Sequence, residues 1–542
     1  MSKRLELIWP NKDKVLLGLD DSGEPIWGTK ADLELRLLVQ LGAAGETNLD
    51  NLDDLYEQGD NLLIKGDNLL ALKALERHFA GKIKCIYIDP PFNTGNAFEH
   101  YDDGLEHTIW LSMMEARLEI LRRLLREDGA IFVEIDDDMM PYLKVMMDEV
   151  FGGRAKPQGR KARVGNYIAT IIWEKKYSPQ NDARWFSDSH DYILVYSRDY
   201  NKWVRNLLPR TEEQDKRYKN PDNDPRGLWK AADLSVKTPN PRDIYQITTP
   251  SGRVVAPPES RSWVVSRERF EELTKENRIW FGKKGSNVPA LKIFLSEVQE
   301  GVVPKTIWFR EEVGDNEEAK KEIKQIFEDI TEQVFTTPKP ERLIKRIIEL
   351  ATKPGDWVLD SFPGSGTTAA VAHKLQRRWI GIELGDHAET LCLPRLRKVQ
   401  AGDDGLILSK QVGWKGGGGF RYCVLGESLF ARDKDTGLVM INPRYTNGPL
   451  VAAVCNLEGF RLNNDSFFHG VRDSIYAHIT EEKVTQAYLD AIVEQLPDGK
   501  SLSIYCLKRA ADLKIPEEIK IKRIPKELQI PRYLASSPGG DK

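Results

Sequence analysis

Two stretches of the chain alternate short apolar segments with segments whose apolar residues recur at helical spacing. In the first stretch, strand patterns at 62–65, 84–88 and 130–135 flank helix patterns at 68–79 and 111–125. In the second, strand patterns at 357–359 and 379–382 accompany helix patterns at 343–351 and 367–375. Strands that alternate with helices predict a doubly wound α/β domain with a mostly parallel sheet.

The alternation is lost between the two stretches, where prolines, tryptophans and charges are mixed around one strand-like segment, 192–196. We therefore predict one α/β domain that is split by an insertion and followed by a smaller α+β domain. The C-terminal part carries strand patterns at 420–425 and 501–507 and a helix pattern at 481–496. The expected boundaries are an N-terminal arm with a short helix near 30–41 (1–55), the first half of the α/β domain (56–152), the insertion (153–312), the second half (313–401) and the C-terminal domain (402–542).

Composition excludes several classes of protein. Of the 542 residues 40% are hydrophobic, which is enough for a substantial core and excludes general disorder. No apolar run approaches the roughly 20 residues that span a bilayer, and the basic start is not followed by a signal-peptide core. The 5 cysteines are scattered, without a CxxC pair, which disfavours a disulfide framework or zinc site. We expect a soluble, cytoplasmic protein with no membrane partner and no metal.

A glycine loop follows the strand pattern at 357–359. Gly364 and Gly366 precede a helix pattern that starts at Thr367, and glycines at such a turn let the backbone approach a ligand closely. Glu383 ends the next strand pattern, where a carboxylate in a nucleotide-type fold accepts ribose hydroxyls. The lysine of a phosphate-binding loop is missing after Gly366, so an ATPase is disfavoured. An adenosine-containing ligand without a pyrophosphate fits this pattern best.

A second motif, Asp-Pro-Pro-Phe at 89–92, ends the strand pattern at 84–88. Asp89 offers a carboxylate and Pro90 a carbonyl without a competing N–H group, and Pro91 adds rigidity to the loop. Two acceptors aimed at one point suit an NH₂ group, and the ring of Phe92 suits stacking on a planar base. We predict that this loop binds an amino-substituted base.

These motifs resemble those of amino-group DNA methyltransferases that use S-adenosylmethionine (AdoMet). The order, with the catalytic motif first and the AdoMet loop last, resembles the beta class. The segments LIKGDNLLALKAL and GAIFVEIDDD further resemble the modification (Mod) subunit of type III restriction–modification systems. The resemblance covers roughly residues 55–400 and implies a Rossmann-like methyltransferase domain, interrupted by a target-recognition insertion, that methylates the N6 amino group of an adenine flipped out of duplex DNA.

The resemblance also implies residue roles. Asp89, Pro90, Pro91 and Phe92 are the expected catalytic residues. Glu383 is expected to hold the AdoMet ribose, Asp67 to lie near its adenine, and Thr337 and Lys339 to reach its carboxylate. The remaining expected AdoMet contacts, around the methionyl part, are Asp360, Phe362, Gly364, Gly366 and Thr367.

Basic residues crowd the start of the insertion, with seven between Gly153 and Asn181 against one acid. Basic residues interleaved with tyrosine and tryptophan suit phosphate contact and target recognition. The expected DNA-binding residues are Arg154, Lys156, Arg160, Lys161, Arg163, Lys175 and Lys176.

Other readings stay open at this point. Methylation of cytosine C5 is disfavoured because its Pro-Cys motif is absent, whereas methylation of cytosine N4 needs nearly the same geometry. A non-catalytic recognition subunit that anchors a partner nuclease is the reading from another class. Double-stranded DNA is the expected substrate, and a second copy of the chain and a separate restriction (helicase/nuclease) subunit are the expected protein partners.

Overall fold

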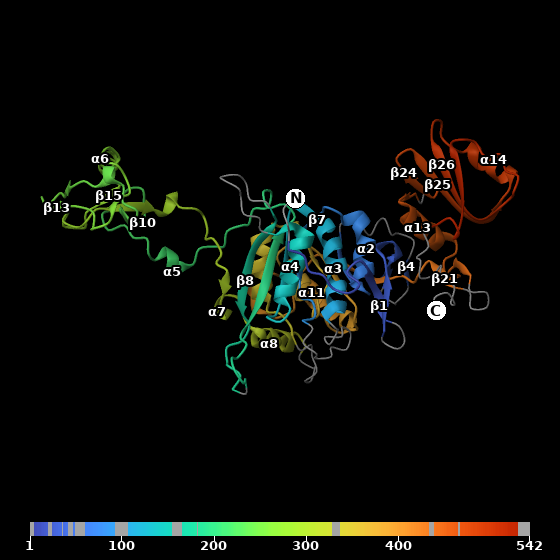
Figure 1. Ribbon diagram of the computed structural model, residues 1–542, viewed down its shortest axis with the longest axis horizontal. Coiled ribbons are helices and arrows are strands. Elements are labelled where there is room, and N and C mark those ends of the chain that lie inside the picture. Colours follow the sequence, from blue (N-terminus) through green and yellow to red (C-terminus); the bar gives the residue numbers. More distant parts are fainter. Residues whose placement is uncertain are drawn as a thin grey trace. The chain divides into compact units, whose positions relative to one another are not determined.

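The computed structural model describes most of the chain (Figure 1). The described residues are 5–19, 24–34, 36–41, 47–48, 60–92, 107–153, 165–181, 183–327, 337–432, 438–463 and 467–528.

An eleven-stranded sheet forms the centre of the α/β domain. Six neighbouring strands, β7-β6-β18-β19-β5-β20, run parallel, while β9 lies antiparallel between β7 and β8. This mixed, mostly parallel arrangement confirms the predicted α/β fold. In spatial order the strands are β17 (Ile307–Trp308), β8 (Tyr167–Glu174), β9 (His190–Ser197), β7 (Leu125–Ile135), β6 (Ile83–Ile88), β18 (Trp357–Asp360), β19 (Arg378–Glu383), β5 (Asn61–Lys65), β20 (Phe420–Leu425), β3 (Leu38–Leu41) and β4 (Thr47–Asn48).

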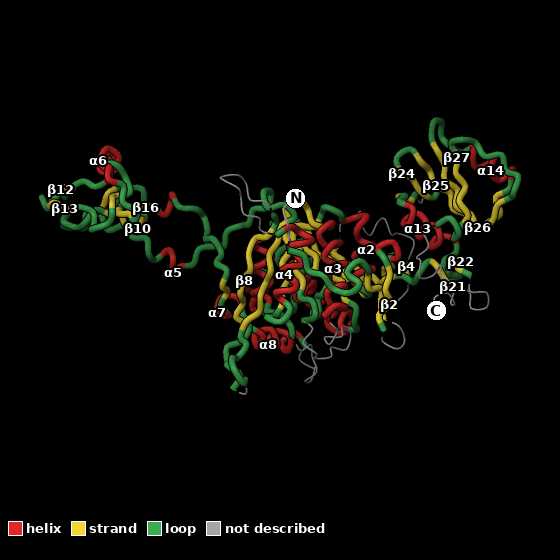
Figure 2. Tube along the Cα trace, in the orientation of Figure 1, coloured by secondary structure: helices red, strands yellow, loops and turns green. Residues whose placement is uncertain are grey.

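Helices pack against this sheet in two groups, and Figure 2 shows the helices in red beside the yellow strands. One group is α2 (Asn68–Phe79), α3 (His107–Leu124) and α4 (Met140–Met147); the other is α9 (Glu341–Ala351), α10 (Thr367–Lys374) and α11 (Leu393–Ala401). Alternate strand residues such as Leu62, Ile86 and Ile131 join the buried core with the first group. Successive strand residues face opposite sides of a sheet, so the residues next to Leu62, Ile86 and Ile131 along each strand face away from the first group.

Three local expectations for this domain were wrong. The helix expected near 30–41 is a short 3₁₀ turn, η1 (Lys30–Asp32), and residues 38–41 form β3 in the sheet. The strand expected at 130–135 begins earlier, because β7 starts at Leu125, and Gly129 within it leaves room for the carbonyl oxygens of Ile83 and Lys84. The strand at 420–425, assigned to the C-terminal domain, is β20 and pairs with β5.

The insertion is narrower than the expected 153–312. Residues 207–304 form a compact unit, whereas β8, β9 and β17 belong to the central sheet. The unit buries Leu234, Trp263 and Phe270 in a core of its own. Its elements are α5 (Glu212–Asp215), β10 (Trp229–Asp233), β11 (Ser235–Val236), η3 (Pro241–Asp243), β12 (Ile247–Thr248), β13 (Val254–Val255), β14 (Ser262–Trp263), α6 (Arg267–Lys275), β15 (Ile279–Trp280), β16 (Ala290–Phe294) and η4 (Leu295–Glu297).

The C-terminal part contains a five-stranded sheet, β23-β24-β25-β26-β27. The expected strand at 501–507 is confirmed as part of β26, and the helix expected over 481–496 is shorter, because β25 extends to Val484. The elements are β21 (Phe430–Arg432), β22 (Val439–Ile441), α13 (Asn447–Glu458), β23 (Arg461–Leu462), β24 (Gly470–Arg472), β25 (Ile475–Val484), α14 (Gln486–Glu494), β26 (Ser501–Arg509) and β27 (Ile519–Arg523).

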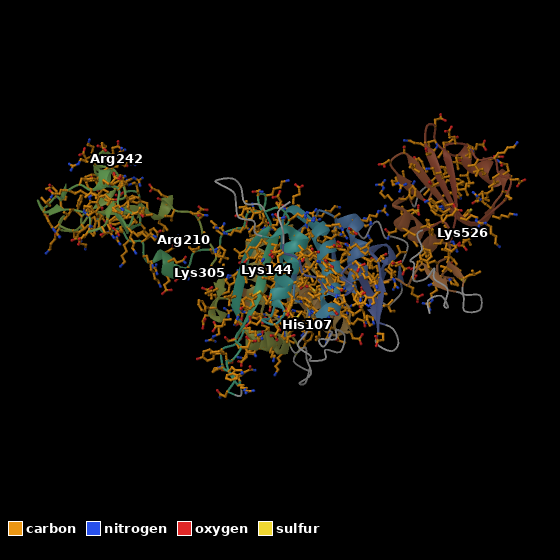
Figure 3. All side chains as sticks on the ribbon, viewed as in Figure 1. His107, Lys144, Arg210, Arg242, Lys305 and Lys526 are labelled. Carbon is orange, nitrogen blue, oxygen red and sulfur yellow. The ribbon has the colours of Figure 1, made fainter. Side chains whose placement is uncertain are left out.

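Other helices and strands lie elsewhere in the described residues. They are β1 (Val15–Leu19), β2 (Pro25–Gly28), η2 (Asp148–Gly152), α7 (Arg310–Val313), α8 (Asn316–Ile326), η5 (Ala388–Cys392) and α12 (Ile407–Val412). The ammonium of Lys144 in α4, labelled in Figure 3, lies 4.3 Å from the ring centre of Tyr167 and so connects this helix to β8. Within the described residues, no helix combines the length and the apolar character that crossing a membrane requires.

Candidate active site

The sequence motifs meet at one edge of the sheet. Strands β6, β18, β19 and β5 are parallel neighbours, so their carboxyl ends lie side by side. Asp89 follows β6, Asp360 and Glu383 end β18 and β19, and Asp67 follows β5. Ligands of open α/β sheets bind at this edge. The fold therefore brings both motifs, which lie 271 positions apart from Asp89 to Asp360, onto adjacent strands.

Backbone N–H groups of the glycine loop bind the carboxylates that flank it. Phe362 donates its N–H to Asp360 at 2.9 Å, and Gly364 donates its N–H to Glu383 at 2.9 Å. Gly385 donates a further N–H to Glu383 at 3.2 Å. Glu383 thus fixes the position of the loop as well as closing the strand.

The two glycines of this loop need their conformational freedom. Gly364 and Gly366 have φ angles of +51° and +77°, which favour glycine. A Cβ atom at Gly366 would lie 3.3 Å from Cα of Cys392 in η5. Gly366 also caps α10, so the loop turns directly into the helix that begins at Thr367.

Burial raises the pKa of the Asp360 and Glu383 carboxyls to about 7. At Asp360, hydrogen bonds from Thr368 and Phe362 oppose this shift. At Glu383 three backbone N–H groups oppose it. Carboxyl groups with a pKa near neutrality that line one edge of a sheet are typical of a functional site. The arrangement offers acceptors for the hydroxyl groups of a ribose.

Arg117 and Asn68 join two strand ends, and neither residue stood out in the sequence patterns. Asn68 donates to the backbone carbonyl of Ser361 at 2.7 Å, and Arg117 donates to both Asn68 and Asp67. Asp67 also accepts the N–H of Leu70 at 3.0 Å and caps α2. Its carboxylate, expected near the AdoMet adenine, is thus held by Arg117 and the first turn of α2.

Thr367 and Arg395 form a buried contact on the side of the glycine loop facing α11. Arg395 donates to the hydroxyl of Thr367 at 2.8 Å and to Glu341 at 2.9 Å. The side chain of Thr367, expected to contact AdoMet, therefore connects the loop to Arg395 of α11. Arg395 is a further residue that the sequence patterns did not reveal.

The carboxylate of Asp89 is ion-paired with Lys339, whose ammonium also lies 3.2 Å from Glu134. Glu134 is fully buried on β7 and accepts the phenolic hydrogen of Tyr87 at 2.6 Å. Burial raises the pKa of Asp89, and Lys339 opposes this shift. Burial likewise raises the pKa of Glu134, to about 8, and the Asp89 charge adds to the increase. This cluster, Asp89, Lys339, Glu134 and Tyr87, includes the first residue of the Asp-Pro-Pro-Phe motif.

Lys339 was expected at the carboxylate of AdoMet, and the structure places its ammonium on two carboxylates of the chain. Thr337, expected beside it, is exposed. Phe92 is partly buried, with the Lys339 ammonium 5.6 Å from its ring centre. Trp110 of α3 donates to the carbonyl of Pro91 at 2.7 Å and so fixes the loop from the other side.

The expected DNA contacts divide into three cases. Lys175 is buried and ion-paired with Asp191 at 2.6 Å and with Asp188 at 3.3 Å, so its charge is used within the protein. Lys176 is partly exposed. The others, Arg154, Lys156, Arg160, Lys161 and Arg163, lie outside the described residues.

Comparison with known proteins identifies the family. Residues 83–392 match the family model described as DNA methylase (N6_N4_Mtase), and the chain belongs to this family. The chain is 35% identical over 341 residues to the StyLTI Mod subunit, a type III restriction–modification enzyme of Salmonella typhimurium, covering 57% of this chain and 49% of that protein. It is 32% identical over 419 residues to the probable HindVI Mod subunit of Haemophilus influenzae, covering 68% of this chain and 54% of that protein.

The chain thus spans about half the length of these curated relatives. Among solved structures, a putative DNA modification methylase of Thermus thermophilus, complexed with S-adenosyl-L-methionine, is 16% identical with a TM-score of 0.32. The match covers 68% of this chain and 100% of that one.

Proposed function

We propose that the chain transfers a methyl group from AdoMet to the N6 amino group of an adenine in double-stranded DNA. The observation that carries the proposal is the position of Asp89 and the glycine loop on adjacent parallel strands, β6 and β18. Membership of the DNA methylase family supports the reaction class, and the two type III Mod relatives support a restriction–modification context.

The residues at the sheet edge fit AdoMet. The positive φ angles of Gly364 and Gly366 form the tight turn of the loop, and Glu383 presents a buried carboxylate to a ribose. Bound AdoMet supplies a methyl group on a positively charged sulfur, and the sulfur–methyl bond breaks as the bond from N6 to the methyl group forms.

Asp89 and the carbonyl of Pro90 would accept the two N6 hydrogens of a flipped adenine. These hydrogen bonds orient the amino group and increase the electron density on its nitrogen. Phe92 would stack on the adenine ring. The methylated N6 group loses one proton, which passes first to Asp89 and then to water. Proximity and orientation supply much of the rate.

Lys339 is placed to keep Asp89 ionised and oriented before the substrate arrives. Its ammonium lies in a buried cluster, where a charge interaction is stronger than in water. Lys339 therefore acts here as a positioning residue for Asp89, in addition to any contact with AdoMet.

We further propose that residues 207–304 read the target sequence, because this unit folds around its own core and carries many basic residues. The partners we propose are a second copy of the chain and a separate restriction subunit. The C-terminal part, with its own sheet, is the candidate for these protein contacts.

A methylation assay tests the proposal. Purified protein is incubated with unmethylated duplex DNA and AdoMet, and the digested nucleosides are identified by mass. We expect N6-methyladenine, reduced about 10²–10⁴-fold in Asp89→Ala and Asp89→Asn, while both variants still bind AdoMet. Formation of N4-methylcytosine would show that cytosine is the substrate and would leave the mechanism unchanged. An absence of AdoMet binding by the wild type would refute the proposal.

A further inference from the structure

A loop with three exposed aromatic side chains projects from the same edge of the sheet as the site. The loop, residues 175–189, joins β8 to β9 (Figure 1). Strand β8 is antiparallel to β9, and β9 is antiparallel to β7, so β8 runs in the direction of β7 and β6. The loop therefore starts at the carboxyl edge, where Asp89 follows β6.

The base of the loop is firmly held. Lys175 donates its backbone N–H to Ser189 at 2.9 Å, and its ammonium pairs with Asp191 and Asp188. Further along the loop, Gln180 donates its N–H to the Ser187 hydroxyl at 2.7 Å. The buried ion pair thus explains why Lys175 does not serve as a surface cation: it anchors the loop.

The outer part of the loop exposes large aromatic rings. Tyr177, Trp185 and Phe186 are 71%, 79% and 95% exposed. Cations accompany two of them, because the guanidinium of Arg184 lies 5.0 Å from the Trp185 ring centre and that of Arg310 lies 3.8 Å from the Tyr177 ring centre. Figure 3 shows side chains as sticks along the segment that extends past the end of β8.

Exposed tryptophan and phenylalanine on one loop have no stabilising role in the free protein, since each ring faces water. Exposed rings with cations beside them suit nucleic acid, in which bases stack on aromatic faces and phosphates attract cations. Apolar side chains that enter DNA between base steps partly unstack them. A loop at the active-site edge is placed to do this beside the base that reacts.

We propose that Trp185 and Phe186 insert into duplex DNA next to the target base and stack in the gap that the extruded base leaves. The inference rests on the proposed function, because only a reaction on a flipped base creates such a gap. Arg184 and Lys176 would contact the neighbouring phosphates. The loop thereby lowers the cost of extrusion and holds the base out for methyl transfer.

The test compares the double variant Trp185→Ala/Phe186→Ala with wild type on two duplexes. The methylated sequence is first mapped by sequencing DNA that the wild-type protein has treated. One synthetic duplex carries this sequence intact, and the other has an abasic site opposite the target adenine, which makes extrusion easier. A third duplex carries 2-aminopurine in place of the target adenine, so that its fluorescence reports extrusion.

We expect the double variant to bind the intact duplex roughly tenfold or more weakly than wild type, since stacking contributes about 1–3 kcal/mol per base. The defect should be much smaller on the abasic duplex, and the 2-aminopurine signal and the single-turnover methylation rate should fall. The aromatic double variant Trp185→Tyr/Phe186→Tyr should retain most of the wild-type DNA affinity, 2-aminopurine signal and methylation rate. Phe467→Ala, at a half-exposed phenylalanine of the C-terminal part, is the matched control and should behave as wild type.

Equal loss of affinity for both duplexes would overturn the proposal, because it would make the rings ordinary DNA contacts. Unchanged extrusion and methylation in the double variant would also overturn it, while leaving the proposed function intact. A wild-type protein that binds AdoMet and methylates no base would overturn both. AdoMet binding, measured for every variant, shows that each one is folded.

Discussion

Glu134 is a buried carboxyl that shares the ammonium of Lys339 with Asp89. When Glu134 is protonated, Lys339 interacts mainly with Asp89 and weakens it as an acceptor. When Glu134 is ionised, it also attracts the Lys339 ammonium, so the interaction between Lys339 and Asp89 becomes weaker. The pKa of Glu134, raised to about 8 by burial, places this change near the working pH of an enzyme.

We therefore expect the single-turnover methylation rate of wild type to rise with pH through about 8. In Glu134→Gln the position stays neutral, so this rise should disappear and the rate should stay at the low-pH value. Rapid-quench measurements across this range check the prediction. An unchanged pH profile in the variant would show that Glu134 does not act on Asp89.

The same carboxyl has a predictable effect on stability. Its pKa is about 8 in the folded protein against 4.5 ordinarily, so the folded state holds a proton that the unfolded state has lost between these values. Stability then falls as pH rises through this window. Glu134→Gln should gain stability relative to wild type at pH 9 and gain none at pH 4, as urea unfolding at each pH would show; an equal difference at both would contradict it.

At the scale of elements, the turn from β18 into α10 depends on Gly366. The Gly366→Ala variant should lose stability by roughly 1–2 kcal/mol from its positive φ. It should also lose AdoMet affinity, because the added Cβ meets the backbone of Cys392 in η5 and shifts the loop.

Gly413 is the matched control for that prediction. Its φ is +68°, and a Cβ there meets no atom within 4 Å. Gly413→Ala should therefore show a similar loss of stability and normal AdoMet affinity. Isothermal titration and thermal unfolding measure the two effects, and equal AdoMet affinities in the two variants would contradict the role of the loop.

At the scale of the whole molecule, the chain enters and leaves the compact unit 207–304 at neighbouring points. Leu208 and Val302 exchange two backbone hydrogen bonds, at 3.0 and 2.8 Å. Replacing residues 209–301 by a short Gly-Ser linker should leave the central sheet folded.

This deletion should retain AdoMet binding and lose methylation of the mapped sequence by at least about 10³-fold, the usual lower range of specific over non-specific DNA binding. Titration with AdoMet and the nucleoside assay measure the two properties. Methylation of the same sequence by the deleted protein would assign recognition to another part of the chain.

The sequence alone was enough to predict the α/β domain and both loops of the site. Apolar spacing determines which segments become strands and helices, and local backbone chemistry places Gly364, Gly366 and the two prolines in turns. The split of the domain was also predictable, because the alternation stops and resumes. The limits of the insertion were not: β8 and β9 carry weak patterns and gain their place by pairing with β7.

What the tertiary structure alone decided is the set of partners around each motif residue. Lys339 lies 250 positions from Asp89 in sequence, and Arg395 lies 54 from Glu341, yet each pair is in contact. Periodicity reports on neighbours within one helix or strand, whereas a buried charge takes whichever partner the folded chain brings to it. The sequence by itself therefore determined most of the strands and the two motif loops of this DNA methylase. Tertiary packing determined the electrostatic setting of Asp89, because that setting depends on side chains from distant strands and loops.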